Sequence, residues 1–184
     1  MHYDEQEIPK LIKAFCERVQ ESPTLKMYFD ADNTLYKFST YNRIYDSLSM
    51  MHTKGFYKNL PVFIEAPDVV SGLQRMGIEV YVISNTIESP WCESEKMESL
   101  NYHFPMIPKS NILLLPPESR KTDYVDDVEH SILVDDYHVN INQWFDAGGL
   151  GIKKSYSGKK RVVPVICSLI DLFPVLYELN LIRR

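Results

Sequence analysis

Short apolar runs alternate with amphipathic stretches along this chain. Apolar side chains recur at helical spacing over residues 8–20, and Ser22-Pro23 ends the pattern, so a helix is predicted there. The same pattern predicts further helices over residues 66–76, 91–100 and 139–147. Apolar runs predict short buried strands at residues 25–29, 78–83, 112–115, 132–134 and 150–153.

The alternation of strands with helices predicts an α/β fold with a doubly wound, Rossmann-like parallel sheet. A length of 184 residues fits a single domain, residues 1–184. Residues 38–52, between the first two strands, are rich in aromatic residues and methionine and have a helical pattern. A last helix is predicted over residues 165–179, interrupted by Pro174.

The charge balance argues against two classes of partner. The chain has 20 basic and 25 acidic residues, a net charge of −5, whereas binding to a nucleic acid polymer or a membrane surface needs a basic face. The chain starts with acidic and polar residues, unlike a signal peptide, and has no apolar run near the roughly 20 residues of a membrane span. A cytoplasmic location is the default. Cys16, Cys92 and Cys167 are expected to be buried or half-buried reduced thiols, because their spacing fits neither a metal site nor a disulfide framework.

Two acidic residues follow the first predicted strand directly. Asp30 and Asp32 therefore lie where ligands bind in open α/β sheets, outside the carboxyl ends of the strands. Carboxylates this close repel each other, so the site needs a bound cation or a shared proton. A carboxylate can attack phosphorus, which makes Asp30 a candidate nucleophile and Asp32 a candidate general acid and base. Taken alone, an Asp-x-Asp pair could also cap a helix or lie in a solvated loop.

Polar residues at two other strand ends extend this candidate site. Ser84 follows the second strand, and its hydroxyl, with nearby backbone N–H groups, could hold phosphate oxygens. Lys121 could offset the charge of a phosphate and of an attacking carboxylate. Asp135 and Asp136 follow the fourth strand, where an acidic pair is costly unless it faces a cation such as Mg²⁺. Each residue alone fits an ordinary loop or surface role, but their common placement supports one site.

The four motifs, in this order, resemble the pattern of the haloacid dehalogenase (HAD) superfamily, most of whose members are Mg²⁺-dependent phosphatases. The resemblance implies that Asp30 is the nucleophile and a metal ligand. Asp32 would be the acid/base and would offer its backbone carbonyl to Mg²⁺. Ser84 and Asn85 would bind the phosphate.

The resemblance also assigns the remaining charged residues. Lys121 would be the catalytic and phosphate-binding lysine, with Lys109 as a poorer rival because it precedes the third strand. Asp136 fits the direct metal ligand, and Asp135 would act through a water, although the reverse assignment stays open.

A closer resemblance, over residues 25–155, is to the 5′(3′)-deoxyribonucleotidase family. It implies a small helical cap at about residues 35–73, a nucleoside monophosphate as substrate, Phe38 stacked on the base, and a homodimer. The chain departs from the family at Asn33-Thr34, where Gly-Val is usual. The segments that carry the resemblance are residues 55–61, 65–67, 80–85, 92–96, 103–105 and 148–153.

Two alternatives to a nucleotidase stay open at the level of sequence. One is a HAD phosphatase for another small phosphomonoester, such as a sugar phosphate, or for a phosphoprotein. The other is a phosphate- or nucleotide-binding protein without turnover. Several aromatic residues could either line a base pocket or form the core of the cap: Phe38, Tyr41, Tyr45, Phe56 and Tyr57.

Overall fold

A six-stranded parallel sheet forms the centre of the molecule in the computed structural model, which describes residues 7–21, 24–38, 50–155 and 163–183. The strand order is β3-β2-β1-β4-β5-β6, and every pairing is parallel. Apolar residues dominate the inner strands, as a sheet covered on both faces requires. The strands are β1 (Lys26–Phe29), β2 (Glu79–Asn85), β3 (Ile112–Leu115), β4 (Ser131–Asp135), β5 (Leu150–Lys154) and β6 (Val165–Ile166).

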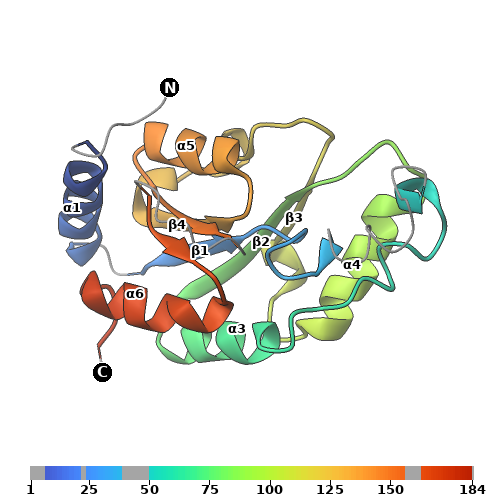
Figure 1. Ribbon diagram of the computed structural model, residues 1–184, viewed down its shortest axis with the longest axis horizontal. Coiled ribbons are helices and arrows are strands. Elements are labelled where there is room, and N and C mark those ends of the chain that lie inside the picture. Colours follow the sequence, from blue (N-terminus) through green and yellow to red (C-terminus); the bar gives the residue numbers. More distant parts are fainter. Residues whose placement is uncertain (1–6, 22–23, 39–49, 156–162, 184) are drawn as a thin grey trace.

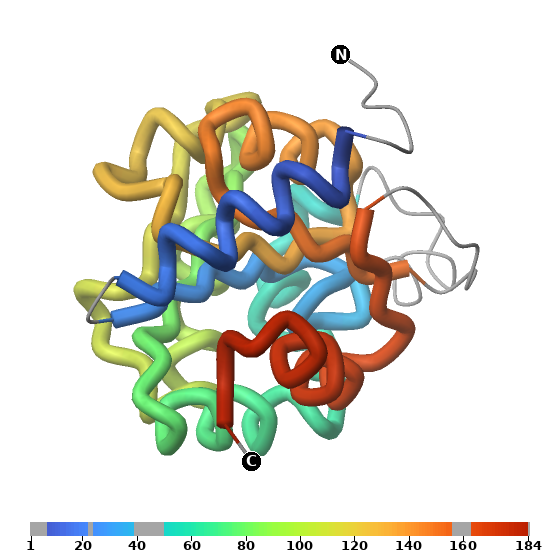
Figure 2. Tube along the Cα trace, turned by 90° about the vertical axis from the view of Figure 1, so that its left-hand side faces the viewer, coloured from blue at the N-terminus to red at the C-terminus, as the bar shows by residue number. Residues whose placement is uncertain are grey.

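Helices lie on both sides of this sheet. In Figure 1, α5 lies above the sheet, α3 and α6 lie below it, and α4 lies at the opposite end of the molecule from α1. Figure 2 shows α1 running across the front of the molecule in that view, above the C-terminal segment. The α-helices are α1 (Glu7–Gln20), α3 (Ala66–Arg75), α4 (Cys92–His103), α5 (His138–Asp146) and α6 (Leu172–Glu178). Short 3₁₀ helices are η1 (Met50–His52), η2 (Lys109–Asn111), η3 (Lys121–Tyr124), η4 (Val128–His130) and η5 (Leu169–Asp171).

The strand order reverses between β1 and β4. From β1 the chain proceeds to β2 and β3 on one side, and it then returns to β4, β5 and β6 on the other. Such a switch point leaves a crevice outside the carboxyl ends of the two central strands. Phe29 pairs with Val134 in the register of β1 and β4, so the next residues, Asp30 and Asp135, emerge side by side.

Close packing of α5 against β5 depends on two glycines. A Cβ on Gly151 would lie 2.7 Å from Ile141 Cγ2, and one on Gly149 would lie 2.4 Å from Trp144 Cδ1. Both distances are shorter than real side chains allow, so only glycine lets the helix approach. The buried Trp144 then packs against Tyr28 of β1, with ring centroids 5.4 Å apart.

The predicted fold class and the five predicted strands are confirmed, with one error near the C-terminus. Residues 165–166 form edge strand β6 and not the start of a helix. The helix starts later because Ser168 and Asp171 form a capping box, which places Pro174 in the first turn of α6, where proline is tolerated.

Other predictions can be compared with the described residues as well. The three cysteines are free thiols, and Cys92 is buried and Cys16 half-buried as expected. The expectation is wrong for Cys167, which is exposed. None of the helices in the described part of the chain is long and apolar enough to span a membrane. Most of the predicted helix at 38–52, with Tyr41 and Tyr45, lies outside the described residues, which show only η1 at its end.

Candidate active site

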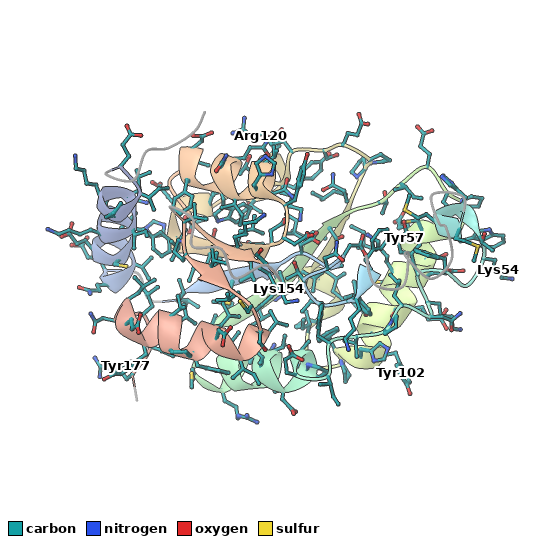
Figure 3. The ribbon with its side chains drawn as sticks, viewed as in Figure 1. Lys54, Tyr57, Tyr102, Arg120, Lys154 and Tyr177 are labelled. Atoms are coloured by element: carbon teal, nitrogen blue, oxygen red, sulfur yellow. The ribbon has the colours of Figure 1, made fainter. Side chains whose placement is uncertain are left out.

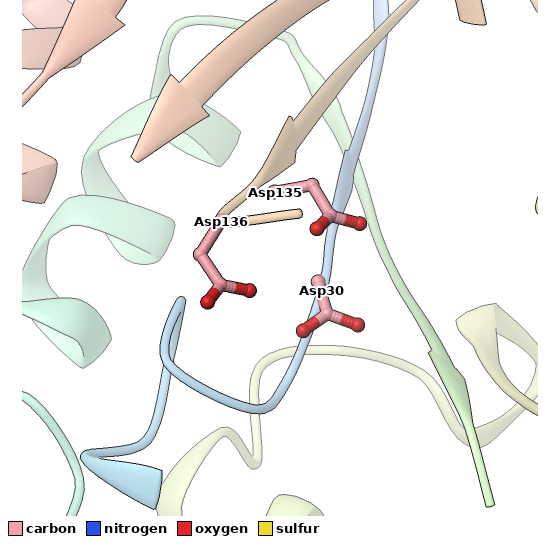
Figure 4. Close-up of side chains that lie close together, drawn as sticks. All are labelled: Asp30, Asp135 and Asp136. Atoms are coloured by element: carbon pink, nitrogen blue, oxygen red, sulfur yellow. The ribbon is translucent and has the colours of Figure 1, made fainter. Parts of the chain in front are cut away.

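Three carboxylates meet at the switch point of the sheet. One oxygen from each of Asp30, Asp135 and Asp136 lies within 4.8 Å of the others, and Figure 4 shows the three side chains converging from the ends of β1 and β4. Asp30 and Asp135 are buried, and Asp136 is half-buried. Burial, followed by the charges of Asp30 and Asp135, raises the pKa of Asp136 to about 7. Such mutual repulsion would be relieved by a divalent cation.

A buried lysine bridges two of these acids. Lys121, the first residue of η3, donates hydrogen bonds from Nζ to Asp30 Oδ1 at 2.6 Å and to Asp135 Oδ2 at 2.7 Å. Burial alone would lower the pKa of Lys121, but the two carboxylates hold it above its usual value. The rival Lys109 is exposed in η2 and does not line the cleft that holds the acids, as far as the described residues define it.

The two acids at the end of β4 accept hydrogen bonds from further donors. Asp135 accepts hydrogen bonds from the Tyr137 backbone N–H at 2.7 Å and from Asn140 Nδ2 at 2.8 Å. Asp136 Oδ2 accepts one from Asn33 Nδ2 at 3.0 Å. Asn33 has a φ of 61°, a left-handed conformation that glycine and asparagine adopt most readily. Asparagine can therefore occupy this position, where the 5′(3′)-deoxyribonucleotidase family usually has glycine.

Asp32 contacts a different lysine. Lys96 of α4 is buried, and its Nζ donates to Asp32 Oδ2 at 2.7 Å, to Ser84 Oγ at 3.1 Å and to the Asn85 carbonyl at 2.8 Å. Asp32 Oδ1 is shielded and has no hydrogen-bond partner among the described residues. Burial raises the pKa of Asp32, Lys96 opposes this, and Asp30 adds to it. A raised pKa favours the protonated form, which a general acid needs.

Ser84 and Asn85 close the site from the end of β2. Ser84 is buried beside Lys96. The side-chain amide of Asn85 donates to the carbonyls of Pro116 and Ser119 at 3.1 and 2.9 Å. Asn85 therefore holds the loop that leads to Lys121, and its amide N–H groups are already engaged there.

The predicted site residues line a single cleft of about 550 Å³. Phe38 lies at its edge, half-buried, with its ring centroid 5.7 Å from Phe56 and 6.4 Å from Tyr57. Phe56 and Tyr57 are buried and belong to the core of this segment. The cleft is lined by Asp30, Asp32, Asn33, Phe38, Ser84, Asn85, Lys121, Asp135, Asp136 and seven other residues.

Sequence reasoning did not assign a role to four residues that support this site. Lys96, the side chain of Asn33, Asn140 and Lys153 all donate to the predicted acids or their backbone, with Lys153 Nζ 2.5 Å from the Asp136 carbonyl. The only signal for Lys96 was its place in the segment 92–96 that carries the family resemblance.

Comparison with known families identifies the protein class. The profile of the family described as "5′ nucleotidase, deoxy (Pyrimidine), cytosolic type C protein" matches residues 13–160. The chain belongs to this family of HAD-type enzymes, and it is therefore a phosphatase of the nucleotidase group. No curated protein matches the chain at the level of sequence.

Several solved structures that share this fold are described as HAD hydrolases or phosphatases. A HAD hydrolase from Bacillus subtilis bound to magnesium has a TM-score of 0.62 and 14% identity, covering 83% of this chain and 98% of its own. A D,D-heptose 1,7-bisphosphate phosphatase from B. bronchiseptica, complexed with magnesium and phosphate, has a TM-score of 0.59 and 10% identity, covering 84% and 98%. A HAD-like hydrolase from Xanthomonas campestris has a TM-score of 0.60 and 12% identity, covering 86% and 92%.

Proposed function

We propose that the protein hydrolyses nucleoside monophosphates, as a 5′(3′)-deoxyribonucleotidase, through an aspartyl-phosphate on Asp30 with Mg²⁺ as cofactor. The observation that carries the proposal is the contact of Lys121 with Asp30 and Asp135, beside Asp136, in a cleft that also contains Asp32. Membership of the nucleotidase family supports the choice of substrate class.

The donor set fits Mg²⁺. The three clustered carboxylates supply hard oxygen ligands. The pKa of Asp136 is raised by burial and then by the charges of Asp30 and Asp135, and a cation would relieve the repulsion among these charges. Asp30, Asp136 and the Asp32 carbonyl would hold the ion, with Asp135 acting through a water. Bound there, it would offset negative charge on the phosphoryl oxygens and on the attacking carboxylate.

In the first step, a carboxylate oxygen of Asp30 attacks phosphorus and the bond from phosphorus to the leaving oxygen breaks. Lys121 holds Oδ1 of Asp30, which leaves Oδ2 to attack. Protonated Asp32 transfers its proton to the leaving alkoxide, so that a nucleoside departs as a neutral alcohol. Lys121 uses two of its three N–H donors on carboxylates in the described structure, and the third can bind a phosphoryl oxygen.

In the second step, water attacks the phosphorus of the aspartyl-phosphate. Asp32, now a carboxylate, takes a proton from the water as the oxygen–phosphorus bond forms. The bond from phosphorus to Asp30 breaks, which regenerates the Asp30 carboxylate and releases inorganic phosphate. Ser84, with nearby backbone N–H groups, would bind the phosphate in both steps.

Recognition of the nucleoside falls to the segment between the first two motifs. We assign a small cap to about residues 35–73, within which Phe38 lines the cleft and can stack on a base. The family description names a deoxy, pyrimidine nucleotidase of cytosolic type, which favours pyrimidine deoxynucleotides as substrates and a cytoplasmic location. The homodimer implied by the resemblance stays a prediction.

The test is a panel of phosphomonoesters with phosphate release as the readout. The panel contains purine and pyrimidine nucleoside 5′- and 3′-monophosphates, a hexose phosphate, a phosphopeptide and p-nitrophenyl phosphate, each with Mg²⁺ and with excess chelator. We expect Mg²⁺-dependent turnover that favours deoxynucleoside monophosphates and is lost in Asp30→Asn. A preference for the sugar phosphate or the phosphopeptide would overturn the substrate assignment, and full activity in chelator would overturn the metal assignment.

A further inference from the structure

A second buried lysine, Lys96, lies beside the candidate general acid. Only 4% of its side chain is exposed, although it belongs to α4, a helix outside the four sequence motifs. Its Nζ contacts Asp32 Oδ2, Ser84 Oγ and the Asn85 carbonyl, which belong to two different strand ends of the site. Burying an ammonium is costly unless it is paired and hydrogen-bonded, and this one is both.

The number of donors separates the roles of the two buried lysines. An ammonium group has three N–H donors. Lys96 directs all three at protein oxygens, whereas Lys121 directs two in the described structure. Among the described residues that line the cleft, Lys121 is present and Lys96 is not. Lys96 therefore has no spare N–H donor for a phosphoryl oxygen, whereas Lys121 has one.

Glu95, the residue before Lys96, connects α4 to segment 55–58. The buried Glu95 carboxylate accepts hydrogen bonds from the backbone N–H groups of Gly55, Tyr57 and Lys58. Tyr57 lies against α4, with its ring centroid 5.1 Å from Lys96 Nζ (Figure 3). Consecutive residues of one helix thus join segment 55–58 to the acid that would protonate the leaving group.

We propose that Lys96 is a positioning residue that sets the direction of the Asp32 carboxylate for proton transfer to the leaving group. By donating a hydrogen bond to Oδ2, Lys96 fixes the rotation of the Asp32 carboxyl group. This inference rests on the proposed phosphatase function, because Asp32 needs that direction only when it protonates an alkoxide.

The test compares two substrates with different leaving groups in Lys96→Met. Cleavage of a pyrimidine deoxynucleoside 5′-monophosphate releases the nucleoside alkoxide, which needs the proton, whereas cleavage of p-nitrophenyl phosphate releases p-nitrophenolate, which leaves without one. We expect kcat for the nucleotide to fall roughly 10–100-fold, the usual effect of removing a side chain that orients a functional group. For p-nitrophenyl phosphate kcat should be nearly unchanged, as should the inhibition constant of inorganic phosphate. Lys58→Met, which removes an exposed lysine of segment 55–58, is the matched control and should leave both substrates unaffected.

A double-mutant cycle shows whether Lys96 acts through Asp32. In the Asp32→Asn background, Lys96→Met should cause no further loss on the nucleotide, because the group being oriented is already gone. The proposal would be overturned by equal losses of kcat on both substrates or by a higher inhibition constant of phosphate in Lys96→Met. Additive losses of kcat in the double variant would overturn it as well. Thermal unfolding checks folding, and if Lys96→Met does not fold, Lys96→Arg keeps the buried charge and provides the same comparison. A wild-type protein inactive on both substrates would instead overturn the proposed function.

Discussion

At the scale of single residues, the two acids of the first motif differ in the lysine that each contacts. Asp30 shares Lys121 with Asp135, whereas Asp32 is bound by Lys96. The first arrangement places the candidate nucleophile beside the ammonium group of Lys121, and the second orients a carboxyl group of raised pKa. Two residues of the same type can therefore take opposite roles, because their surroundings differ.

Replacing Lys121 tests its role in the cluster. Lys121→Met removes the only described lysine that contacts Asp30. The negative charges of the phosphoryl group and of Asp30 are then no longer offset by a fixed ammonium group. We expect kcat to fall about 10²–10³-fold, as for other losses of one preorganised donor. Lys109→Met, which removes the exposed lysine of η2, is the control and should retain wild-type kinetics. Comparable losses in both variants would contradict this assignment.

The left-handed residue Asn33 links backbone shape to the metal site. Asn33→Gly keeps the φ of 61° accessible but removes the hydrogen bond to Asp136, so we expect Mg²⁺ affinity to weaken by about 10-fold. Asn33→Ala should lose the same bond and also destabilise the fold by about 1–3 kcal/mol, because alanine is strained there. Calorimetric Mg²⁺ titration and thermal unfolding measure the two effects. Unchanged Mg²⁺ affinity in Asn33→Gly would show that this hydrogen bond does not matter.

Most of the acids and hydroxyls of the site could be predicted because they lie at strand ends. Asp30, Asp32, Ser84, Asp135 and Asp136 follow apolar strands directly, and a strand end is visible in sequence. Two of the four supporting donors, Lys96 and Asn140, come from helices, where a polar residue has the same local pattern as any solvated one. Only the packing of α4 against the sheet shows that this lysine points inward.

At the scale of elements, recognition of the substrate should depend on Phe38. Its ring lies at the edge of the cleft and is backed by Phe56 and Tyr57. Loss of one stacking ring is worth roughly 1–3 kcal/mol, so Phe38→Ala should lower kcat/KM for nucleotides by about 5- to 150-fold. Turnover of p-nitrophenyl phosphate should change little, because it is too short to reach the ring.

Tyr102→Ala is the matched control for this variant. Tyr102 projects from α4 with 78% exposure and does not line the cleft, as far as the described residues show (Figure 3). Its loss should leave nucleotide kinetics unchanged. Unaltered nucleotide kinetics in Phe38→Ala would mean that Phe38 serves the core of its segment or that the substrate has no base.

The elements that periodicity predicted well are the long or strongly apolar ones. Helix α1 and strands β1 to β5 bury continuous faces, so their patterns are clear. The two-residue strand β6 has no pattern of its own and is defined by its pairing with Lys153 and Lys154 of β5. The helix that follows is delayed by the Ser168–Asp171 capping box, which the apolar pattern does not show.

At the scale of the whole molecule, the acidic cluster should make metal binding depend on pH. The pKa of Asp136 is raised from 3.8 to about 7, so the metal-free native state holds an extra proton between these values. Protonation of Asp136 therefore stabilises the folded state at low pH, and this stabilisation is lost as pH rises through about 7. Mg²⁺ needs the carboxylate, so its affinity should rise over the same window.

Thermal unfolding with and without Mg²⁺ measures this linkage. The stabilisation by Mg²⁺ should be larger at roughly pH 8 than at roughly pH 5, because at the lower value protons compete for Asp136. In Asp136→Asn the difference between the two pH values should become smaller. A Mg²⁺ effect of equal size at both pH values in the wild type would contradict the linkage.

The central claim, that Asp30 carries the phosphoryl group, is tested most directly by trapping the intermediate. The wild-type protein is mixed with Mg²⁺ and a deoxynucleoside 5′-monophosphate carrying a radiolabelled phosphate, and the reaction is quenched in acid within one turnover. We predict labelled protein with the phosphoryl group on the peptide that contains Asp30, and no labelled protein in Asp30→Asn. Rapid nucleotide hydrolysis with no label on the protein, or label in Asp30→Asn equal to wild type, would contradict the account.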